Sequence, residues 1–392
     1  MSFEEAKKLD DHFVMHTFAR KPVLLVEGSG MEVKDDEGKT YLDFIAGIGV
    51  DSLGHCHPAV VRAIQDQAAK LIHVSNYYYI EQRGEVAKLL SDMLNVCVPK
   101  FFRAPWPVFF ANSGAEANEC AIKLARLYSK KMGGGGQTII TMDRSFHGRT
   151  LATLAATAQP AKQEAFQPLP GGFMHVPMND LNALHQAVYN NLADVCAVMI
   201  EPVQGEAGVY PWDPDTLYDV AQFSLLTRFS RAFSAAANSP SPSRIWALHP
   251  TLSPWLRASL LAFPWVLALL ASRLLKHSNQ ATMVPPSAAA TWLWLGRGHY
   301  DDRVTEVGDY FAEKLAQVEG VTEVRGMGLM LGADLEEGID AHKVVAQGLE
   351  EGFLLNATGS NTLRFLPPLI VTETEIDKLI DALPGMIAAV RE

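Results

Sequence analysis

The stretch "VFFANSGAEANECAIKLARLYSKK", residues 108–131, joins an apolar run to a long amphipathic run through a short polar turn. Residues 108–111 predict a strand, and Ala, Ile and Leu at helical spacing predict a helix from about Glu116 to Lys131. Ser113 is suited to cap that helix, and the small residues Gly114 and Ala115 let a ligand approach the first backbone amides. The stretch predicts a strand, a turn and a helix that either cradles a phosphate or is simply a capped helix.

Two further strands predict where the ligand lies. "QTIITMD" (137–143) leads into "RSFHGRT" (144–150), and "VCAVMIEP" (195–202) leads into "EPVQGEAGVYP" (201–211). In an open α/β sheet, ligands bind outside the carboxyl ends of the strands. We therefore expect an α/β fold in which these two loops and the turn before Glu116 converge on one site.

The side chains in these loops suit a small anionic ligand with a ring. Phe146 offers a flat apolar face, and Arg149 offers a two-pronged donor for a carboxylate. Glu201 and Glu206 add carboxylates. Taken singly, Phe146 fits a core position and the charged residues fit solvated loops, but together they indicate a binding site.

Composition narrows the class of partner. The chain has 392 residues, 48% of them hydrophobic, which is enough for a large domain and a smaller one. Its formal charge of -11 argues against nucleic acid, because phosphate binding needs clustered Lys and Arg. We therefore expect small-molecule substrates.

Cysteine and histidine usage predicts neither disulfides nor a metal. The four cysteines show no disulfide or zinc spacing, and the acidic N-terminal segment does not resemble a signal peptide, so we expect a cytoplasmic protein. His55, Cys56 and His57 are adjacent on a predicted loop, where side chains rarely converge on one ion. Elsewhere, residues 23–44 predict a hairpin around Asp35–Gly38, and an amphipathic helix follows His57.

Residues 223–295 differ in composition from both flanks. No acidic residue occurs between Asp219 and Asp301, no glycine occurs between Gly208 and Gly296, and five of the seven tryptophans lie in this interval. An ordinary domain mixes both signs of charge and uses glycine at its turns. The segment therefore does not match the domain around it.

Four motifs on the flanks resemble the class III, ornithine-type, aminotransferases, which use pyridoxal 5'-phosphate. They are "NSGAEANECAIKLAR" (112–126), "SFHGRT" (145–150), "EPVQGEAGVYP" (201–211) and "LRFLPPLIVTETEID" (363–377). "NYYYIEQRGEVAKLL" (76–90) and "FHGRTLATLAATAQ" (146–159) are especially similar to the acetylornithine branch of that family. The resemblance covers residues 1–222 and 296–392 and is specific because the four motifs occur together.

The resemblance implies a cofactor site and a fold. Ser113, Gly114 and Ala115 would hold the cofactor phosphate. Phe146 would stack on the pyridine ring, with His147 and Glu201 beside it. The implied fold is the type I fold of pyridoxal-phosphate enzymes. A large domain (46–296) would hold a mostly parallel seven-stranded sheet, and a small α+β domain would combine residues 1–45 and 297–392.

The resemblance also implies the substrates. Arg149 would bind the substrate α-carboxylate, and Tyr78, or its neighbour Tyr77 or Tyr79, would line the donor side. Glu206 would pair with Arg364 while the donor reacts, and then release it to the acceptor's carboxylate. The implied reaction is transamination between N2-acetyl-L-ornithine and 2-oxoglutarate in arginine biosynthesis, in a homodimer. Ornithine, succinyl-diaminopimelate and 4-aminobutyrate are alternative substrates, although Arg149 counts against the last.

The family also needs an Asp for the pyridine nitrogen and a Lys that bonds to the cofactor aldehyde, and this sequence lacks both motifs. Between residues 222 and 296 there is one lysine, Lys276, and no Asp.

The codons of this segment, when read in a shifted frame, can encode motifs that the family would place here. They permit "DEVQSG" from Leu226, "AKG" from Trp255, then "PMGA", and "HGTTFGG" across 282–290. Because Trp and Met have single codons, Trp265–Val266 and Met283–Val284 force the shifted glycines. We therefore interpret residues 223–295 as translated out of frame, and expect a disrupted central domain and an inactive chain.

Two non-catalytic interpretations of the chain are alternatives: a membrane-attached interaction protein and a pseudo-enzyme. The longest uncharged run, Ala258–Ser272, has 15 residues and contains Pro264, whereas a membrane span needs roughly 18 to 20. A membrane-attached interaction protein using residues 254–275 is thus disfavoured, and we expect no membrane partner. A pseudo-enzyme that binds pyridoxal phosphate loosely remains an alternative.

Overall fold

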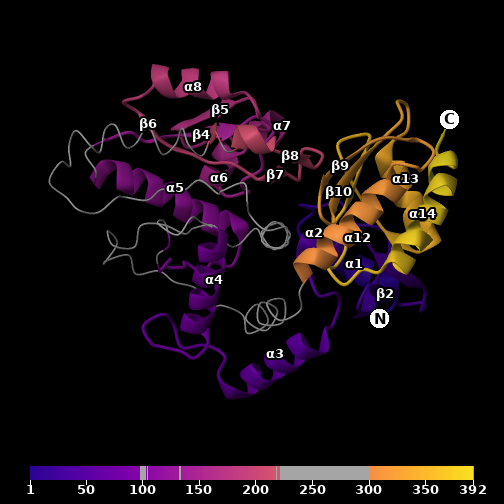
Figure 1. The fold of residues 1–392 in the computed structure, drawn as a ribbon. Helices are drawn as coiled ribbons and strands as arrows, with labels where there is room; N and C mark the ends of the chain where they lie inside the picture. Colours follow the sequence, from indigo (N-terminus) through magenta and orange to yellow (C-terminus); the bar gives the residue numbers. More distant parts are fainter. Residues whose placement is uncertain (98–102, 104, 132–133, 218, 221–299, 392) are drawn as a thin grey trace. The chain divides into compact units, whose positions relative to one another are not determined.

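The computed structural model of the chain describes residues 1–97, 103, 105–131, 134–217, 219–220 and 300–391 (Figure 1). These residues form two units: unit 1 comprises Met1–Ala63 and Asp302–Glu392, and unit 2 comprises Ile64–Asp301. Each unit is described by itself. The out-of-frame interpretation and the 254–275 segment lie outside the described residues.

Unit 1 contains two four-stranded sheets. The first has the order β1-β2-β3-β11, made of β1 (Leu25–Ser29), β2 (Glu32–Asp35), β3 (Thr40–Asp43) and β11 (Phe353–Leu354). The predicted hairpin is β2 and β3, which pair antiparallel around Gly38. The short strand β11 pairs parallel to β3, so the two ends of the chain share one sheet.

The second sheet of unit 1 is antiparallel and is packed by helices. Its order is β12-β13-β10-β9, made of β12 (Asn356–Thr358), β13 (Thr362–Phe365), β10 (Met330–Leu335) and β9 (Val321–Met327). Figure 1 shows three helices gathered beside it: α12 (Tyr300–Leu315), α13 (Ala341–Glu351) and α14 (Glu373–Ala388). Phe311 of α12 and Phe365 of β13 are both fully buried, with ring centroids 5.2 Å apart. The core of unit 1 therefore lies between this sheet and its helices.

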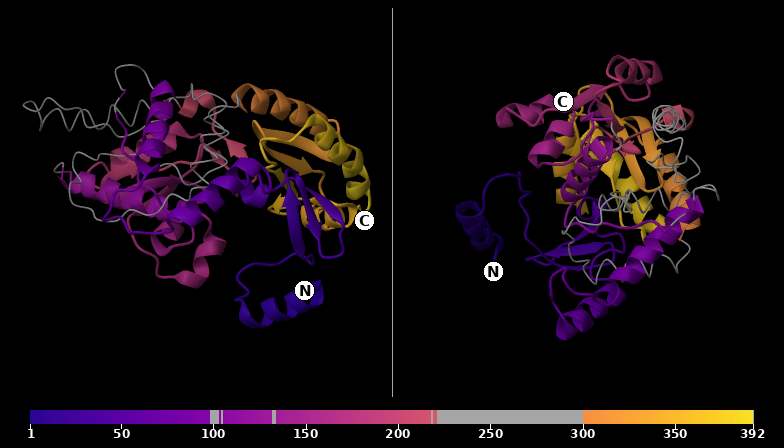
Figure 2. Two further views of the ribbon diagram at one scale, coloured as in Figure 1. Left: turned by 90° about the horizontal axis from the view of Figure 1, so that it is seen from below. Right: turned by 90° about the vertical axis from the view of Figure 1, so that its left-hand side faces the viewer.

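The N-terminal helix α1 (Phe3–Phe13) contributes nothing to that core. None of its residues is buried, and both views in Figure 2 show it apart from the strands. It begins at Ser2 with a capping box formed with Glu5. Its Phe13 remains 76% exposed.

Residues 46–63 group with unit 1, although the sequence predicts that they belong to the large domain. They include α2 (Ala46–Gly49) and the start of α3 (Pro58–Lys70), the predicted amphipathic helix. Gly30 and His55 exchange two backbone hydrogen bonds of 2.9 and 2.8 Å, and the Leu369 N–H donates to the Ser52 carbonyl over 2.8 Å. These bonds tie the segment to unit 1 strands and loops that lie far away in sequence.

Unit 2 is a three-layer α/β/α arrangement, which confirms the fold class. Its sheet has the order β5-β4-β6, all parallel, made of β5 (Phe173–Val176), β4 (Thr138–Met142) and β6 (Val195–Val198). Figure 1 shows α8 on one side of this sheet and α5 and α6 on the other. The bounds of the unit 2 helices are α4 (Arg83–Cys97), α5 (Gly114–Lys131), α6 (Leu151–Ala156), α7 (Pro160–Gln163), the 3-10 turn η2 (Glu164–Phe166) and α8 (Leu181–Asn190).

The alternation along β4 explains these layers. Ile140 and Met142 pack in one cluster with Leu184 of α8. Ile139 packs in another with Ile122 of α5. Since successive strand residues point to opposite faces, an apolar run with both faces covered becomes a central parallel strand.

The strand predicted at 108–111 does not form. A strand exists only where its backbone pairs with a neighbour, and within the described residues β4 is flanked on its two edges by β5 and β6. The apolar and β-branched residues at 108–111 predicted a strand, but composition does not show whether a neighbouring strand is there to pair with it. The helix after it, α5, is confirmed and begins two residues earlier than predicted.

Candidate functional site

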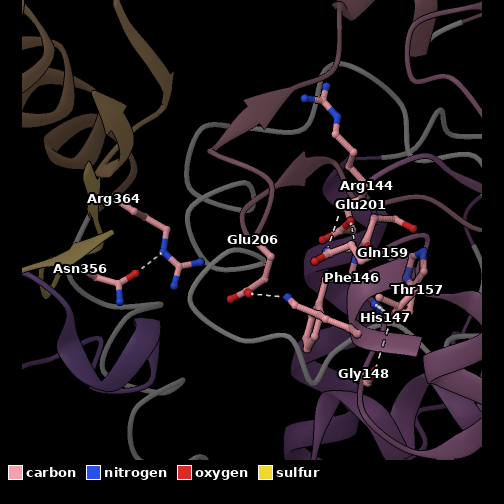
Figure 3. Close-up of polar contacts among 12 residues, drawn as sticks. Arg144, Phe146, His147, Gly148, Thr157, Gln159, Glu201, Glu206, Asn356 and Arg364 are labelled. Atoms are coloured by element: carbon pink, nitrogen blue, oxygen red, sulfur yellow. Dashed lines mark hydrogen bonds and ion pairs between the residues drawn. The ribbon is translucent and has the colours of Figure 1, made fainter. Parts of the chain in front are cut away.

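The loops after β4 and β6 meet in unit 2, as predicted. The backbone N–H of Phe146 donates to Glu201 Oε2 over 2.9 Å. The Gln204 side-chain amide donates to the Asp143 carbonyl over 2.9 Å, next to the short hairpin of β7 (Val203–Gln204) and β8 (Tyr210–Pro211). Figure 3 shows Glu201 beside Phe146.

The start of α5 joins the same place. Asn118 Nδ2 donates to the His147 carbonyl over 2.8 Å, one turn into the helix. Gly148 has a φ of +136°, and a Cβ added to it would lie 2.8 Å from Ala115 Cβ and 2.5 Å from Thr153 Oγ1. The 144–150 loop therefore lies against the first turn of α5, which only glycine allows at position 148.

The first amides of α5 are open to a ligand. Ser113 Oγ accepts the Glu116 N–H over 3.1 Å, and Glu116 Oε2 accepts the Asn112 N–H over 2.6 Å, which confirms Ser113 as the cap. Within the described part of the chain, no acceptor takes the amides of Gly114 and Ala115, and both residues are half-exposed. Open amides at the positive end of an 18-residue helix can bind an anion such as a phosphate.

Two cations lie near the ring of Phe146. The Lys162 Nζ is 4.9 Å from the ring centroid, and the Arg149 guanidinium carbon is 5.7 Å from it. Lys162 also donates to Glu206 Oε2 over 3.1 Å, the contact drawn at Glu206 in Figure 3. The predicted Phe146, Arg149, Glu201 and Glu206 thus form one cluster, with Lys162 among them.

Burial changes the protonation of two groups in this cluster. Burial raises the pKa of Glu201 to about 8, against a smaller opposite effect of the Phe146 N–H. The residue as a whole is half-buried, but its carboxyl group is enclosed by protein atoms. Burial also lowers the pKa of His147 to about 4, with a further contribution from His175. At neutral pH both Glu201 and His147 are therefore mainly uncharged.

His147 lies beneath the loop, with a side chain that is 4% exposed. Its backbone N–H donates to Thr157 Oγ1 over 2.8 Å. Its Nε2 atom is buried and has no partner among the residues that the structure describes. His147 therefore supports the loop from inside.

The remaining predicted residues belong to other elements of the chain. Tyr77, Tyr78 and Tyr79 are 84%, 65% and 102% exposed in the segment before α4. Arg364, on β13 of unit 1, is 5% exposed and donates from Nε to Asn356 Oδ1 over 3.1 Å. Because Glu206 and Arg364 belong to different units, their pairing stays a prediction.

His55 serves the backbone of unit 1. Its Nε2 lies 2.8 Å from Asp43 Oδ2, and the other oxygen of that carboxylate accepts the Ile45 N–H over 2.8 Å. In the described ranges there is no cluster of three metal-ligating side chains. No helix among those residues is long and apolar enough to cross a membrane.

Three polar residues of the site were not predicted from the sequence: Lys162, Asn118 and Thr157. Asn118 could have been found, because it lies four residues after Gly114 and so on the same helix face. Lys162 and Thr157 follow "FHGRT" by 12 and 7 residues, respectively. Nothing in their spacing shows that α6 and α7 bring them back to the loop.

Comparisons with known proteins identify the family. The class-III aminotransferase family model matches residues 15–225 and 287–387, so the match is interrupted at 226–286. The chain is 41% identical to the acetylornithine aminotransferase of Methanocaldococcus jannaschii, covering 100% of each chain. It is 39% identical to the enzyme of that name from Caldanaerobacter subterraneus, covering 97% of this chain and 98% of the relative.

Two solved aminotransferase structures are also similar to this chain. The N-acetylornithine aminotransferase of Stenotrophomonas maltophilia is 27% identical with a TM-score of 0.72, covering 97% of this chain and 98% of that one. The ornithine aminotransferase of Toxoplasma gondii, crystallised with partial occupancy of pyridoxal phosphate, is 25% identical with a TM-score of 0.79, covering 99% of this chain and 95% of that one. The chain belongs to the class-III aminotransferases, a family of pyridoxal-phosphate-dependent enzymes that transfer an amino group from a donor to a keto acid.

Proposed function

We propose that the unit 2 site is that of an aminotransferase acting on N2-acetyl-L-ornithine and 2-oxoglutarate in arginine biosynthesis. We also propose that this chain does not catalyse the reaction, because it lacks the lysine that bonds to the cofactor. The convergence of open α5 amides, the Phe146 ring and Arg149 carries the proposal of the site. The relatives named acetylornithine aminotransferase support the choice of donor. Ornithine and succinyl-diaminopimelate are the alternative donors.

The described residues fit two parts of pyridoxal phosphate. The Gly114 and Ala115 amides, presented by the helix that Ser113 caps, would hold its phosphate. Phe146, whose backbone is anchored by Glu201, would present its ring face to the pyridine. When bound, the cofactor supplies an electron sink for the bond broken at the substrate Cα.

The chain's own residues would orient the substrate. Arg149 is exposed and can hold a carboxylate through two parallel hydrogen bonds. The Glu201 carboxyl, being mainly uncharged at neutral pH, places no extra negative charge beside an anionic substrate. We assign the roles of Tyr78 and Arg364 in substrate binding on the resemblance of their motifs alone.

The sequence lacks the motifs of the lysine that bonds to the cofactor aldehyde and of the Asp that pairs with the pyridine nitrogen. Residues 222–296 contain only Lys276 and no Asp. The gap in the family match, 226–286, falls inside the segment that we interpret as out of frame, 223–295, and supports that interpretation. A protein of this sequence would therefore bind pyridoxal phosphate loosely at most.

One experiment tests the missing amine. The purified chain is incubated with pyridoxal phosphate, reduced with borohydride and digested, and its peptides are mapped by mass spectrometry. We expect no stoichiometric modification of a single lysine. Stoichiometric attachment to one lysine, Lys276 included, together with a visible absorbance band before reduction, would contradict the proposal. Steady-state kinetics of a frame-corrected protein on the three donors would then decide among them.

We also propose a cytoplasmic homodimer built from a large pyridoxal-phosphate domain and a small α+β domain. Large apolar side chains remain exposed on both units, which supports an interface: Phe13 at 76%, Phe18 at 75% and Ile72 at 76%. Light scattering after size exclusion measures the mass of the assembly. A monomer over the micromolar range would contradict the homodimer.

A further inference from the structure

Gln159 binds two consecutive carbonyls of the loop that carries Phe146. Its side-chain nitrogen donates to the Arg144 carbonyl over 3.1 Å and to the Ser145 carbonyl over 3.0 Å. One amide nitrogen carries two hydrogens, so it can make both bonds at once. Figure 3 shows Gln159 beside Arg144 and Phe146. A side chain from the start of α7 therefore holds the backbone just before the ring.

Gln204 binds the carbonyl that precedes this pair. Its side-chain nitrogen donates to the Asp143 carbonyl over 2.9 Å, and Gln204 is 1% exposed. The three carbonyls of residues 143–145 are thus all bound by side-chain amides. Because β4 ends at Met142, these amides do for the loop what a neighbouring strand does for the sheet.

The backbone held by Gln159 includes a left-handed residue. Arg144 has a φ of +60°, which L residues other than Asn and Asp rarely adopt. Such a conformation persists only where its surroundings hold it. Gln159 binds the carbonyl of Arg144 itself and that of the next residue. It therefore holds the chain in the direction that leads to Phe146.

The side chain of Gln159 serves the loop and not its own helix. Gln159 is the N-cap of α7, but its side chain makes no capping bond. Its backbone is bound on both sides, because its N–H donates to the Thr157 carbonyl over 2.8 Å and its carbonyl accepts the Lys162 N–H over 2.9 Å. The amide thus reaches the loop from a fixed point.

Gln163 of the same short helix provides an internal comparison. Its side-chain nitrogen donates to the Leu154 carbonyl over 3.0 Å and to the Thr157 carbonyl over 2.7 Å. These carbonyls lie at the end of α6, not in the loop of Phe146. Gln159 and Gln163 therefore make the same kind of bond to different targets, which separates positioning of the ring from general support of the fold.

We propose that Gln159 is a positioning residue for the Phe146 ring: it holds the carbonyls of Arg144 and Ser145, and so orients the ring face toward an aromatic ligand. The inference rests on the proposed function for the identity of that ligand. It adds that recognition of the ligand ring depends on an amide that acts through the loop backbone. Recognition of a phosphate by the α5 amides does not depend on Gln159.

The binding test uses the full chain and two probes. One is 4-deoxypyridoxine 5'-phosphate, which keeps the ring and the phosphate but has no aldehyde, and the other is inorganic phosphate; both are titrated by calorimetry. We expect Gln159→Leu to weaken binding of the ring compound about tenfold and that of phosphate less than about twofold. Gln163→Leu should lower the melting temperature but leave both affinities unchanged.

Gln159→Glu separates lost hydrogen bonds from lost volume. This variant keeps the shape of the side chain, but its ionised carboxylate donates no hydrogen bond. At pH 8 it should weaken binding of the ring compound as Gln159→Leu does. At about pH 5 the carboxyl is partly protonated and regains one donor, so the loss relative to the parent at the same pH should shrink. A loss that is equal at both pH values would overturn the inference.

Hydrogen exchange tests the loop without a ligand. Peptides covering residues 144–150 report the amides of Phe146 and His147, both of which donate to side chains. We expect exchange in these peptides to be about tenfold faster in Gln159→Leu than in the parent, and unchanged in Gln163→Leu. Unchanged protection in Gln159→Leu would overturn the inference.

The two measurements also separate this inference from the proposed function. Equal weakening of the ring compound and of phosphate would show that Gln159 only supports the fold, and would overturn the inference. Loss of ring binding in Gln163→Leu would overturn it as well. If neither the parent nor any variant binds the ring compound, the proposed function fails. Faster exchange confined to residues 144–150 in Gln159→Leu would still support the role of Gln159 in holding Phe146.

Discussion

The backbone N–H of Phe146 and the carboxyl group of Glu201 are joined by a 2.9 Å hydrogen bond across 55 positions of sequence. This bond connects the loop after β4 to the loop after β6, and so fixes the aromatic ring at the carboxyl edge of the sheet. Burial of the Glu201 carboxyl raises its pKa to about 8, although the bond from Phe146 by itself lowers that pKa. The anchor of the ring is therefore also a titratable group.

Glu201 should make stability fall as the pH rises. Its folded-state pKa of about 8 lies above the ordinary value of 4.5, so its contribution is complete below pH 4.5 and is lost as the pH rises to 8. Glu201→Gln does not titrate and can still accept the Phe146 N–H. Its unfolding free energy should exceed that of the parent by an amount that grows over this window, on the order of a few kcal/mol. Urea unfolding at several pH values measures it, with exposed Glu164→Gln as the control; parallel curves for all three proteins would refute it.

His147 should make the free energy of unfolding fall as the pH falls, the opposite of the effect of Glu201. Its folded-state pKa of about 4 lies below the ordinary value of 6.5, so its contribution is complete above pH 6.5 and is lost as the pH falls through 4. Replacing it by Leu removes both the titration and the unpartnered buried Nε2. Urea midpoints between pH 7 and pH 4 should fall less for His147→Leu than for the parent. His342→Leu, at an exposed histidine, should follow the parent.

Gly148 should tolerate no side chain. Alanine there would need a φ of +136° and would place its Cβ 2.5 Å from Thr153 Oγ1. We expect Gly148→Ala to cost about 2 kcal/mol of unfolding free energy and to weaken pyridoxal phosphate binding, because the loop must move off α5. Gly171→Ala is the matched control, since an added Cβ there meets nothing within 4 Å. Equal stability of the two variants would contradict the close approach of loop and helix.

Ser113 should affect both stability and phosphate binding. Ser113→Ala removes the cap of α5, which should lower the free energy of unfolding by about 1 kcal/mol and disorder the amides of Gly114 and Ala115. Thr372→Ala removes a comparable cap from α14 in unit 1 and should cost about as much, with no effect on binding. Thermal melts and fluorescence titration with pyridoxal phosphate distinguish the two. If both variants bind alike, the α5 amides are not the phosphate site.

Local patterns predicted most elements near the site correctly. The hairpin at Asp35–Gly38, α5 with its Ser113 cap, and strands β4 and β6 were read from spacing, turn residues and capping chemistry. These features depend on neighbours within a few positions. The strand at 108–111 was predicted wrongly because a strand also needs a partner, which local sequence does not reveal.

The sequence by itself determined the family motifs, the loops that carry Phe146, Arg149, Glu201 and Glu206, and the lack of an acidic residue or a second lysine across residues 222–296. Those are properties of composition and of short-range order. Only the tertiary structure decided that Lys162 pairs with Glu206, that Glu201 anchors Phe146, and that burial shifts the pKa of Glu201 and His147. Ion pairing and desolvation depend on which distant residues the fold brings together, and no local pattern encodes that.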